Sequence, residues 1–201
     1  MRSTLIFTAA IALIFAGVSF AQDSPIAKGS YQLGGGISFQ SWGGDLYENG
    51  DGDSETDIEF NPFFSYFVTN GLSVGGRLDF SSASQGDAKA SGFGIGPQVA
   101  YYFTVGQKTE TKGSVFPYVG ASFTYASTTT NSGAPGAQDF KLTGTEIGLF
   151  GGAVYMLNGS VGVFGQLEYD MHSLKVKEPV EGDSESGTVL QLFTGFTFFL
   201  P

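Results

Sequence analysis

The feature that most constrains the fold is a recurring segment of about ten residues in which apolar and polar side chains alternate. Eight such segments occur after residue 21, near 30–41, 57–68, 72–82, 92–104, 115–126, 143–157, 160–173 and 187–200. Successive side chains of a β-strand point to opposite sides, so alternation predicts a strand with one apolar and one polar face. The sequence therefore predicts an all-β protein of eight strands.

Charge separates the two faces of these segments. In the segment near 72–82, Leu72 and Phe80 share the apolar face, whereas Arg77 and Asp79 lie on the other. The apolar faces of all eight segments lack Asp, Glu, Lys and Arg. A charge that faces lipid at the bilayer midplane costs about 2–4 kcal/mol, and a narrow lumen suits small and polar residues. These faces predict an eight-stranded antiparallel up-and-down transmembrane β-barrel.

The connections between the segments differ in length. Val68 to Gly71 and Leu157 to Ser160 are tight turns, and the link near 105–114 is longer and polar. The other four links are predicted to be long loops, near 42–56, 83–91, 127–142 and 174–186. Outer-membrane barrels place short turns on the periplasmic side and long loops outside. We therefore expect both chain ends in the periplasm.

The first 21 residues have a different character. Arg2 precedes an apolar run from Leu5 to Phe20, and Ser19-Phe20-Ala21 ends the run with small residues at two of its three positions. This pattern predicts a secretory signal peptide over 1–21, with a membrane anchor as the alternative, and a barrel domain over 22–201. We expect export to the cell outer membrane.

The composition excludes several kinds of partner. The chain has no cysteine, which excludes a lipoprotein anchor, disulfides and thiolate metal sites. Without Arg2, 8 of the 9 basic residues remain against 19 acidic ones. This balance argues against nucleic acid, which requires a basic surface. We expect outer-membrane lipid as the main partner, no cofactor, and a monomer.

Three prolines fall within predicted strands. Pro62, Pro97 and Pro117 each lack the N–H group that a strand contributes to its ladder. In a closed barrel, each of them predicts a bulge or a local break in pairing.

Short motifs along the chain resemble a known family. They are Ser91 to Pro97 (SGFGIGP), Tyr101-Tyr102-Phe103, Val115 to Gly120 (VFPYVG) and Phe63 to Asn70 (FFSYFVTN). These pieces are similar to the outer-membrane β-barrel domain family, which includes the OmpA/OmpX-type eight-stranded barrels, and the resemblance extends over 29–200. It implies an eight-stranded outer-membrane barrel and supplies no catalytic motif.

The polar faces contain a candidate ion-pair cluster. Arg77 is the only basic residue that we place in the lumen, and a buried Arg requires carboxylate partners. The candidate partners are Glu59, Asp79, Glu146, Glu168 and Asp170. The favoured interpretation is an ion-pair plug that ties strands together. A gate or narrow cation path, and a catalytic carboxylate pair, are the alternatives.

Two other candidate sites have weaker support in the sequence. His172 and Ser173 are adjacent, as in a Ser-His pair, but neighbouring strand residues point to opposite faces and cannot easily meet. The acidic stretch 43–57 holds Asp51, Asp53 and Glu55 at alternate positions, which is suited to weak divalent-cation binding. A solvated acidic loop is the simpler interpretation of that stretch.

These features favour a small outer-membrane barrel that is not an enzyme. We expect a structural or surface-interaction role, with any extracellular ligand bound by the long loops. A narrow pore or small-ligand-binding barrel is one alternative, and a lipid-modifying barrel enzyme is another. An eight-stranded interior is just filled by side chains, and Phe63, Phe67, Phe150, Phe164 and Phe193 are expected to fill this one further.

Overall fold

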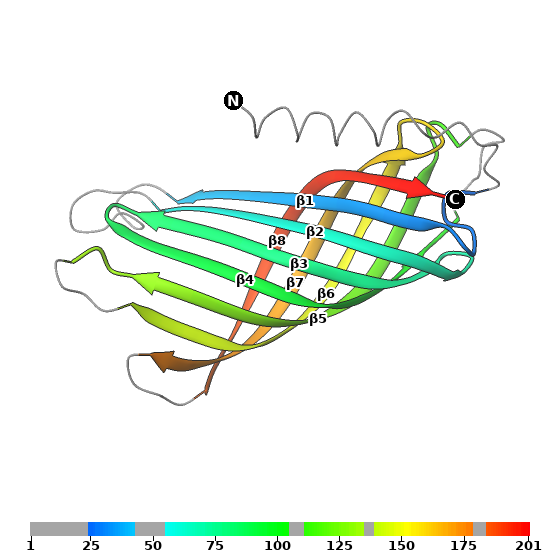
Figure 1. Ribbon diagram of the computed structural model, residues 1–201. Helices are drawn as coiled ribbons and strands as arrows, with labels where there is room; N and C mark the ends of the chain where they lie inside the picture. Colours follow the sequence, from blue (N-terminus) through cyan, green and yellow to red (C-terminus); the bar gives the residue numbers. More distant parts are fainter. Residues whose placement is uncertain (1–23, 43–54, 105–110, 135–138, 179–183) are drawn as a thin grey trace, which may run out of the picture.

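The computed structural model describes residues 24–42, 55–104, 111–134, 139–178 and 184–201, and within them eight antiparallel strands close into a barrel. The strands are β1 (Tyr31–Trp42), β2 (Glu55–Thr69), β3 (Leu72–Gln85), β4 (Ala88–Tyr102), β5 (Val115–Asn131), β6 (Phe140–Met156), β7 (Val161–Glu178) and β8 (Ser184–Leu200). Each strand pairs with its sequence neighbour, and β1 closes the barrel against β8 (Figure 1). The predicted fold class is confirmed. Among the described residues, no helix is both long and apolar enough to cross a membrane.

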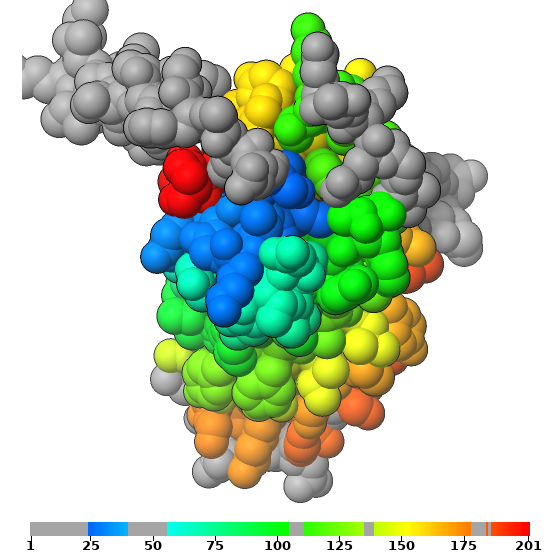
Figure 2. All heavy atoms as spheres, turned by 90° about the vertical axis from the view of Figure 1, so that its right-hand side faces the viewer, coloured from blue at the N-terminus to red at the C-terminus, as the bar shows by residue number. Residues whose placement is uncertain are grey.

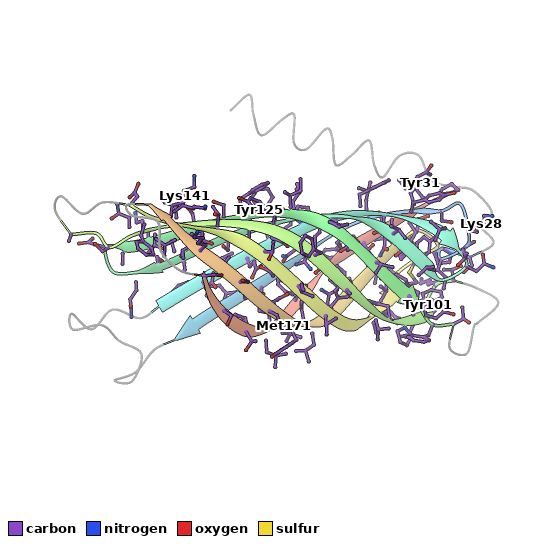
Figure 3. All side chains as sticks on the ribbon, turned by 90° about the horizontal axis from the view of Figure 1, so that it is seen from below. Lys28, Tyr31, Tyr101, Tyr125, Lys141 and Met171 are labelled. Atoms are coloured by element: carbon purple, nitrogen blue, oxygen red, sulfur yellow. The ribbon has the colours of Figure 1, made fainter. Side chains whose placement is uncertain are left out.

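The apolar faces point outward, as predicted. Ile37, Phe123 and Leu149 each keep about half of their surface exposed, at 51%, 49% and 51%. Figure 3 shows Tyr31, Tyr101, Tyr125 and Met171 directed away from the barrel wall. In a soluble protein so much exposed apolar surface would be an association site, whereas here it forms a continuous lipid-facing band.

The strands are longer than the sequence predicted. The expected loop at 83–91 is wrong, because β3 and β4 continue to a two-residue turn at Gly86 and Asp87, where Gly86 has a φ of 58°. The strands β5 to β8 also extend past their predicted ends. The reason is that the apolar alternation stops where polar surroundings begin, whereas the backbone pairing continues.

The outward-facing side chains of β5 to β8 change from apolar to polar toward the outer end of the barrel. The outward positions carry apolar residues up to Tyr125, Ile147, Met171 and Leu190, and beyond them only Ser, Thr, Asn and Lys. These polar outward residues are Ser127, Thr129, Asn131, Lys141, Thr143, Thr145, Ser173, Lys175, Lys177, Ser184, Ser186 and Thr188. The five residues of β5 beyond Ala126 span about 16 Å at the usual rise per residue. The barrel thus rises above the membrane on this side.

The prolines interrupt the ladders without shifting them. Between β2 and β3 the pairing skips Pro62, yet Phe60↔Phe80 and Phe63↔Arg77 share one register. Pro97 produces the same break between β4 and β5. Pro117 lies where β4 ends, and its carbonyl accepts a hydrogen bond from the Phe103 N–H at 2.7 Å. The bulges lie elsewhere, after Phe67 and next to Lys141.

The pairing between β1 and β8, which closes the barrel, is shorter than the pairings between the other neighbouring strands. β1 and β8 pair only through Tyr31–Ile37 and Thr194–Leu200. The outer neighbours continue further, since β1 pairs with β2 as far as Trp42 and β8 pairs with β7 as far as Ser184. We call the unpaired stretch between residues 38–42 and 184–193 the pairing gap.

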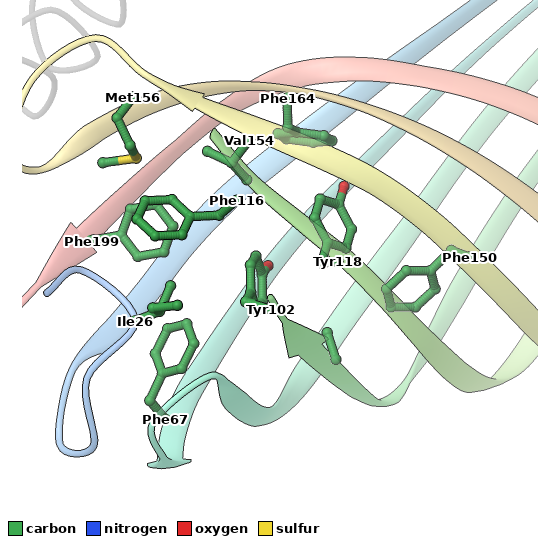
Figure 4. Packing of buried hydrophobic residues seen from close by; sticks show 11 residues of the cluster. Ile26, Phe67, Tyr102, Phe116, Tyr118, Phe150, Val154, Met156, Phe164 and Phe199 are labelled. Carbon is green, nitrogen blue, oxygen red and sulfur yellow. The ribbon is translucent and has the colours of Figure 1, made fainter. Parts of the chain in front are cut away.

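The opposite end of the barrel is closed by the residues that precede β1. The Ile26 carbonyl accepts a hydrogen bond from the Gly71 N–H at 2.8 Å, and the Gly29 N–H donates to the Phe67 carbonyl at 3.0 Å. Figure 2 views this end, where the blue N-terminal residues lie beside the teal turn between β2 and β3. Ile26 is 2% exposed. Its side chain belongs to a buried cluster with Phe67, Tyr102, Phe116, Met156 and Phe199 (Figure 4).

Candidate functional site

The barrel interior is the candidate site, and Arg77 lies at its centre. Strand β3 directs this side chain inward, where 5% of the residue is exposed. Its Nε donates to Asp79 Oδ1 at 2.8 Å, and Nη2 lies 2.7 Å from the same oxygen. Nη1 donates to Ser122 Oγ at 3.3 Å and to Glu168 Oε1. One guanidinium therefore joins β3, β5 and β7.

Glu168 continues this network toward the closed end. The residue is fully buried, and its second oxygen, Oε2, accepts a hydrogen bond from Gln166 Nε2 at 2.8 Å. The side-chain Oε1 of Gln166 in turn accepts a hydrogen bond from the Tyr118 hydroxyl at 2.9 Å. Gly148 leaves room for the network, because a Cβ there would lie 2.5 Å from both Glu168 Oε1 and Ser122 Oγ.

A second polar chain ties β4 to β1 and β8. The Tyr102 hydroxyl donates to Gln32 Oε1 at 3.0 Å, and Gln32 Nε2 donates to Thr197 Oγ1 at 3.0 Å. Gln32 and Thr197 are almost fully buried. The side-chain polar groups of this layer therefore satisfy one another, as expected for buried polar groups.

Aromatic rings close the lumen below Arg77. Tyr102 packs between Phe67 and Tyr118 with its ring tilted to both, and the ring centroids are 5.5 and 5.0 Å apart. Tyr118 also meets Phe150, and the interior phenylalanines that the sequence predicted lie here or just above. Between the rings and Arg77 is a cavity of about 30 Å³, which fits about two waters.

The remaining predicted carboxylates lie on the outer side of Arg77. Asn61 Nδ2 donates to Asp79 Oδ1 at 2.5 Å and reaches Glu59 Oε1 at 3.4 Å. His172 Nδ1 lies 3.1 Å from Glu146 Oε2. Asp170 is 3% exposed, and its Oδ1 has no hydrogen-bond partner among the described residues. The outer lumen thus holds more carboxylates than basic groups.

Of the six predicted lumen residues, the structure brings Arg77, Asp79 and Glu168 into direct contact and places Glu59, Glu146 and Asp170 above them. The divalent-cation candidates Asp51 and Asp53 lie outside the described residues, and Glu55 is described only as the first residue of β2. Among the described residues, no group of three or more His, Cys, Asp or Glu side chains could hold a metal ion.

The adjacent pair His172 and Ser173 separates, as strand geometry requires. His172 faces Glu146 in the lumen, whereas the Ser173 hydroxyl lies 3.2 Å from the Ser184 hydroxyl on the outside. The structure gives these two residues no shared contact from which a nucleophile could be activated.

Sequence reasoning missed several residues of the network. Asn61, Ser122 and Gln166 lie on the polar faces of their strands. Because they are uncharged, nothing in the sequence distinguishes them from the other polar residues on those faces. Tyr102 and Tyr118 are aromatic, and only their place on the inward side of β4 and β5 distinguishes them from the lipid-facing rings. Ile26 precedes the first strand, so no alternation marks it.

Comparisons with known proteins agree with this architecture. A family model described as outer membrane protein beta-barrel domain matches residues 7–198. The outer membrane protein OprG from Pseudomonas aeruginosa aligns with a TM-score of 0.57 at 16% identity, over 89% of this chain and 99% of that one. Neisserial surface protein A aligns with a TM-score of 0.54 at 17% identity, over 85% and 97%. These likenesses to solved structures show the fold alone. No curated protein matches the chain.

Proposed function

Because this chain belongs to the outer membrane protein β-barrel domain family and lies in the cell outer membrane, we propose that it is a non-conducting barrel that presents a polar rim for contacts at the cell surface. The observation that carries this proposal is the sealed lumen. Arg77 and its carboxylate partners block the middle, and the aromatic cluster blocks the end of the barrel at which Ile26 lies. The cavity between them is too small for a solute.

The polar rim consists of the polar outward residues at the outer ends of β5 to β8, from Ser127 on β5 to Thr188 on β8. This rim supports the surface role. Four strands extend beyond the apolar band, and their outward positions hold hydroxyl, amide and ammonium groups. A paired β-sheet holds these groups in fixed positions, which suits recognition better than a free loop does. Any further contribution from the connections at 43–54, 135–138 and 179–183 lies outside the described residues.

We also propose that the protein is not an enzyme. His172, the only histidine, is engaged with Glu146, and the hydroxyl of Ser173 lies on the opposite face of β7. Arg77 is bonded to two carboxylates and so is not available to a substrate. The lipid-modifying alternative therefore has no support from these contacts.

Single-channel recording in planar bilayers tests the sealed lumen. We expect no steady conductance from the folded protein, with an open porin as the positive control and lipid alone as the blank. Stable unitary steps would reject the non-conducting barrel and favour the pore alternative.

The surface role has its own test. Cells that produce a chain in which Ser127, Thr129 and Thr143 are replaced by Ala should lose surface contacts made by the wild-type chain while inserting the barrel normally. Adhesion of the two cell lines to a panel of host and bacterial surfaces, with insertion checked by the heat-dependent gel shift, gives the readout. Equal adhesion of the two cell lines would contradict the role.

A further inference from the structure

We propose that the outward face of β6 and β7 holds the phosphate-bearing head group of a lipid in the outer leaflet. Lys141, Thr143 and Lys175 donate to the phosphate, and the acyl chains lie against the apolar band below them. This site turns part of the polar rim toward the protein's own membrane. It does not depend on the proposed contacts with other surfaces.

Two lysines and a threonine form the head-group site. Thr143 on β6 pairs directly with Lys175 on β7. Lys141 lies two residues before Thr143, and residues two apart in a strand share a face. Lys141 and Lys175 are therefore diagonal neighbours across the two strands, at a separation of about 7–8 Å. Two ammonium groups and the hydroxyl between them can donate to one phosphate at this spacing.

The lysine side chains lie on the outside of the barrel wall. Lys175 is four residues beyond Met171 on β7 and so shares its lipid-facing side. Figure 3 shows Lys141 on the outside of the barrel, at the end opposite Lys28. Lys177, which is exposed, adds a third ammonium group beyond Lys175.

Below the lysines, the same two strands present the rest of a lipid-shaped surface. Thr145 pairs with Ser173, and the next outward pair toward the membrane is Ile147 with Met171. Ile147 and Met171 are exposed parts of the apolar band. From the membrane outward, β6 and β7 thus show apolar side chains, then hydroxyls, then ammonium groups. A phosphate-bearing lipid presents the complementary groups in the same order.

The height of the lysines above the apolar band agrees with a lipid head group. The four residues from Met171 to Lys175 span about 13 Å along the strand at the usual rise. A strand tilt of about 40° reduces this to about 10 Å along the membrane normal. The head-group layer is about 5–8 Å thick on each side of the hydrocarbon core. The flexible lysine stem lets the ammonium group reach down to this layer.

Charge is sorted between the two sides of the wall at this end. The chain has 19 acidic and 9 basic residues, yet lysine is the only charged residue type among the described outward side chains of the polar rim. Glu146 and Asp170 lie on the same strands but in the lumen. Asp139, which precedes β6, accepts a hydrogen bond from Asn131 Nδ2 at 2.7 Å. A protein that is acidic as a whole thus places cationic groups beside the membrane, which favours an anionic lipid.

The lysine on β4 provides a natural contrast. Lys89 is also exposed at the outer end of the barrel and pairs with Asn131 on β5. The strands β3, β4 and β5 contain no other lysine. Lys89 therefore offers the same charge without a second ammonium group on the neighbouring strand.

Photo-crosslinking tests the site on the folded barrel in phosphatidylcholine bilayers. The probes are phosphatidic acid and phosphatidylcholine that carry a diazirine on the acyl chain, and the measurement is the ratio of their labelling of β6 and β7 peptides. We expect the wild type to favour phosphatidic acid, less so at high salt. Lys141→Gln and Lys175→Gln should each lower the ratio about threefold to fivefold. Lys175→Arg should retain it, and Lys89→Gln should leave it unchanged.

The heat-dependent gel shift checks that each variant is folded. Equal labelling of β6 and β7 by the two lipids in the wild type would overturn the head-group site. A loss with Lys89→Gln as large as that with Lys175→Gln would show that total charge, and not the paired lysines, is responsible. Displacement by inorganic phosphate as effective as that by unlabelled phosphatidic acid would overturn the lipid as its source. None of these results bears on the conductance and adhesion tests, so the two proposals can fail separately.

Discussion

At the scale of single residues, Arg77 decides how the lumen is organised. Its strand position places it inside a wall that is apolar on the other face, and a guanidinium there requires carboxylates. Asp79 is two residues away on the same face of β3, so the sequence already places it within reach. Glu168 comes from the opposite wall, and only the closed barrel brings it to Arg77.

Arg77→Ala should lower the free energy of unfolding by about 3–5 kcal/mol, because it leaves the fully buried Glu168 without its cation. Urea unfolding of the barrel in detergent micelles, followed by the gel shift, measures the change. Lys89→Ala, at an exposed position on β4, is the matched control. An Arg77→Ala curve that overlays the wild type would remove the stabilising role of the network.

Gly148→Ala should also destabilise the barrel, by about 1–3 kcal/mol, because the added Cβ displaces the Glu168 and Ser122 side chains from Arg77. Gly165→Ala is the control, since a Cβ there meets nothing within 4 Å. The two midpoints of unfolding are compared directly. Equal values would mean that the lumen accommodates a methyl group at Gly148 at no cost.

At the scale of elements, the strands are defined by pairing and not by polarity alone. Alternation located all eight strands, but it ended β5 at 126 and β7 at 173, whereas they continue to Asn131 and Glu178. Beyond the membrane the outward residues become Ser, Thr and Lys, and the hydrophobic signal disappears while the hydrogen bonds continue. The prolines show the converse, because Pro62 removes a donor and the register is unchanged.

The turn between β2 and β3 should depend on its glycine. Gly71 has a φ of 81°, and a Cβ there would lie 2.7 Å from the Tyr102 carbonyl oxygen. Gly71→Ala should therefore cost about 1–2 kcal/mol from the backbone conformation alone, with the contact adding to it. The midpoint of urea unfolding measures the loss. Gly159→Ala, in the turn between β6 and β7, has open space and no positive φ, and a loss there as large as at Gly71 would contradict the argument.

At the scale of the whole molecule, two layers seal the lumen independently. The ion pairs lie at the middle, and Ile26, Phe67, Tyr102, Phe116, Met156 and Phe199 fill the end where both described termini lie. The residues before β1 thus act as part of the barrel interior, although they form no strand. This double closure is the structural basis of the non-conducting barrel that we propose.

The independence of the two layers is testable. The double variant Arg77→Ala/Glu168→Ala removes the central ion pair but leaves the aromatic cluster in place. We expect it to fold with reduced stability and to remain silent in planar bilayers, like the wild type. Steady conductance by the double variant would show that the ion pair alone seals the barrel.

The sequence by itself determined the strand faces, the closed membrane barrel and the location in the outer membrane. Each of these depends on an energy that acts on residues singly, since a charge facing lipid is costly wherever it occurs along the chain. The contacts between lumen side chains do not follow from energies of single residues. Arg77 and Glu168 are 91 residues apart, and their contact depends on the stagger summed over several strand pairings. The tertiary structure therefore decided the partners of Arg77, the closure by Ile26 and the pairing gap beside Asp170.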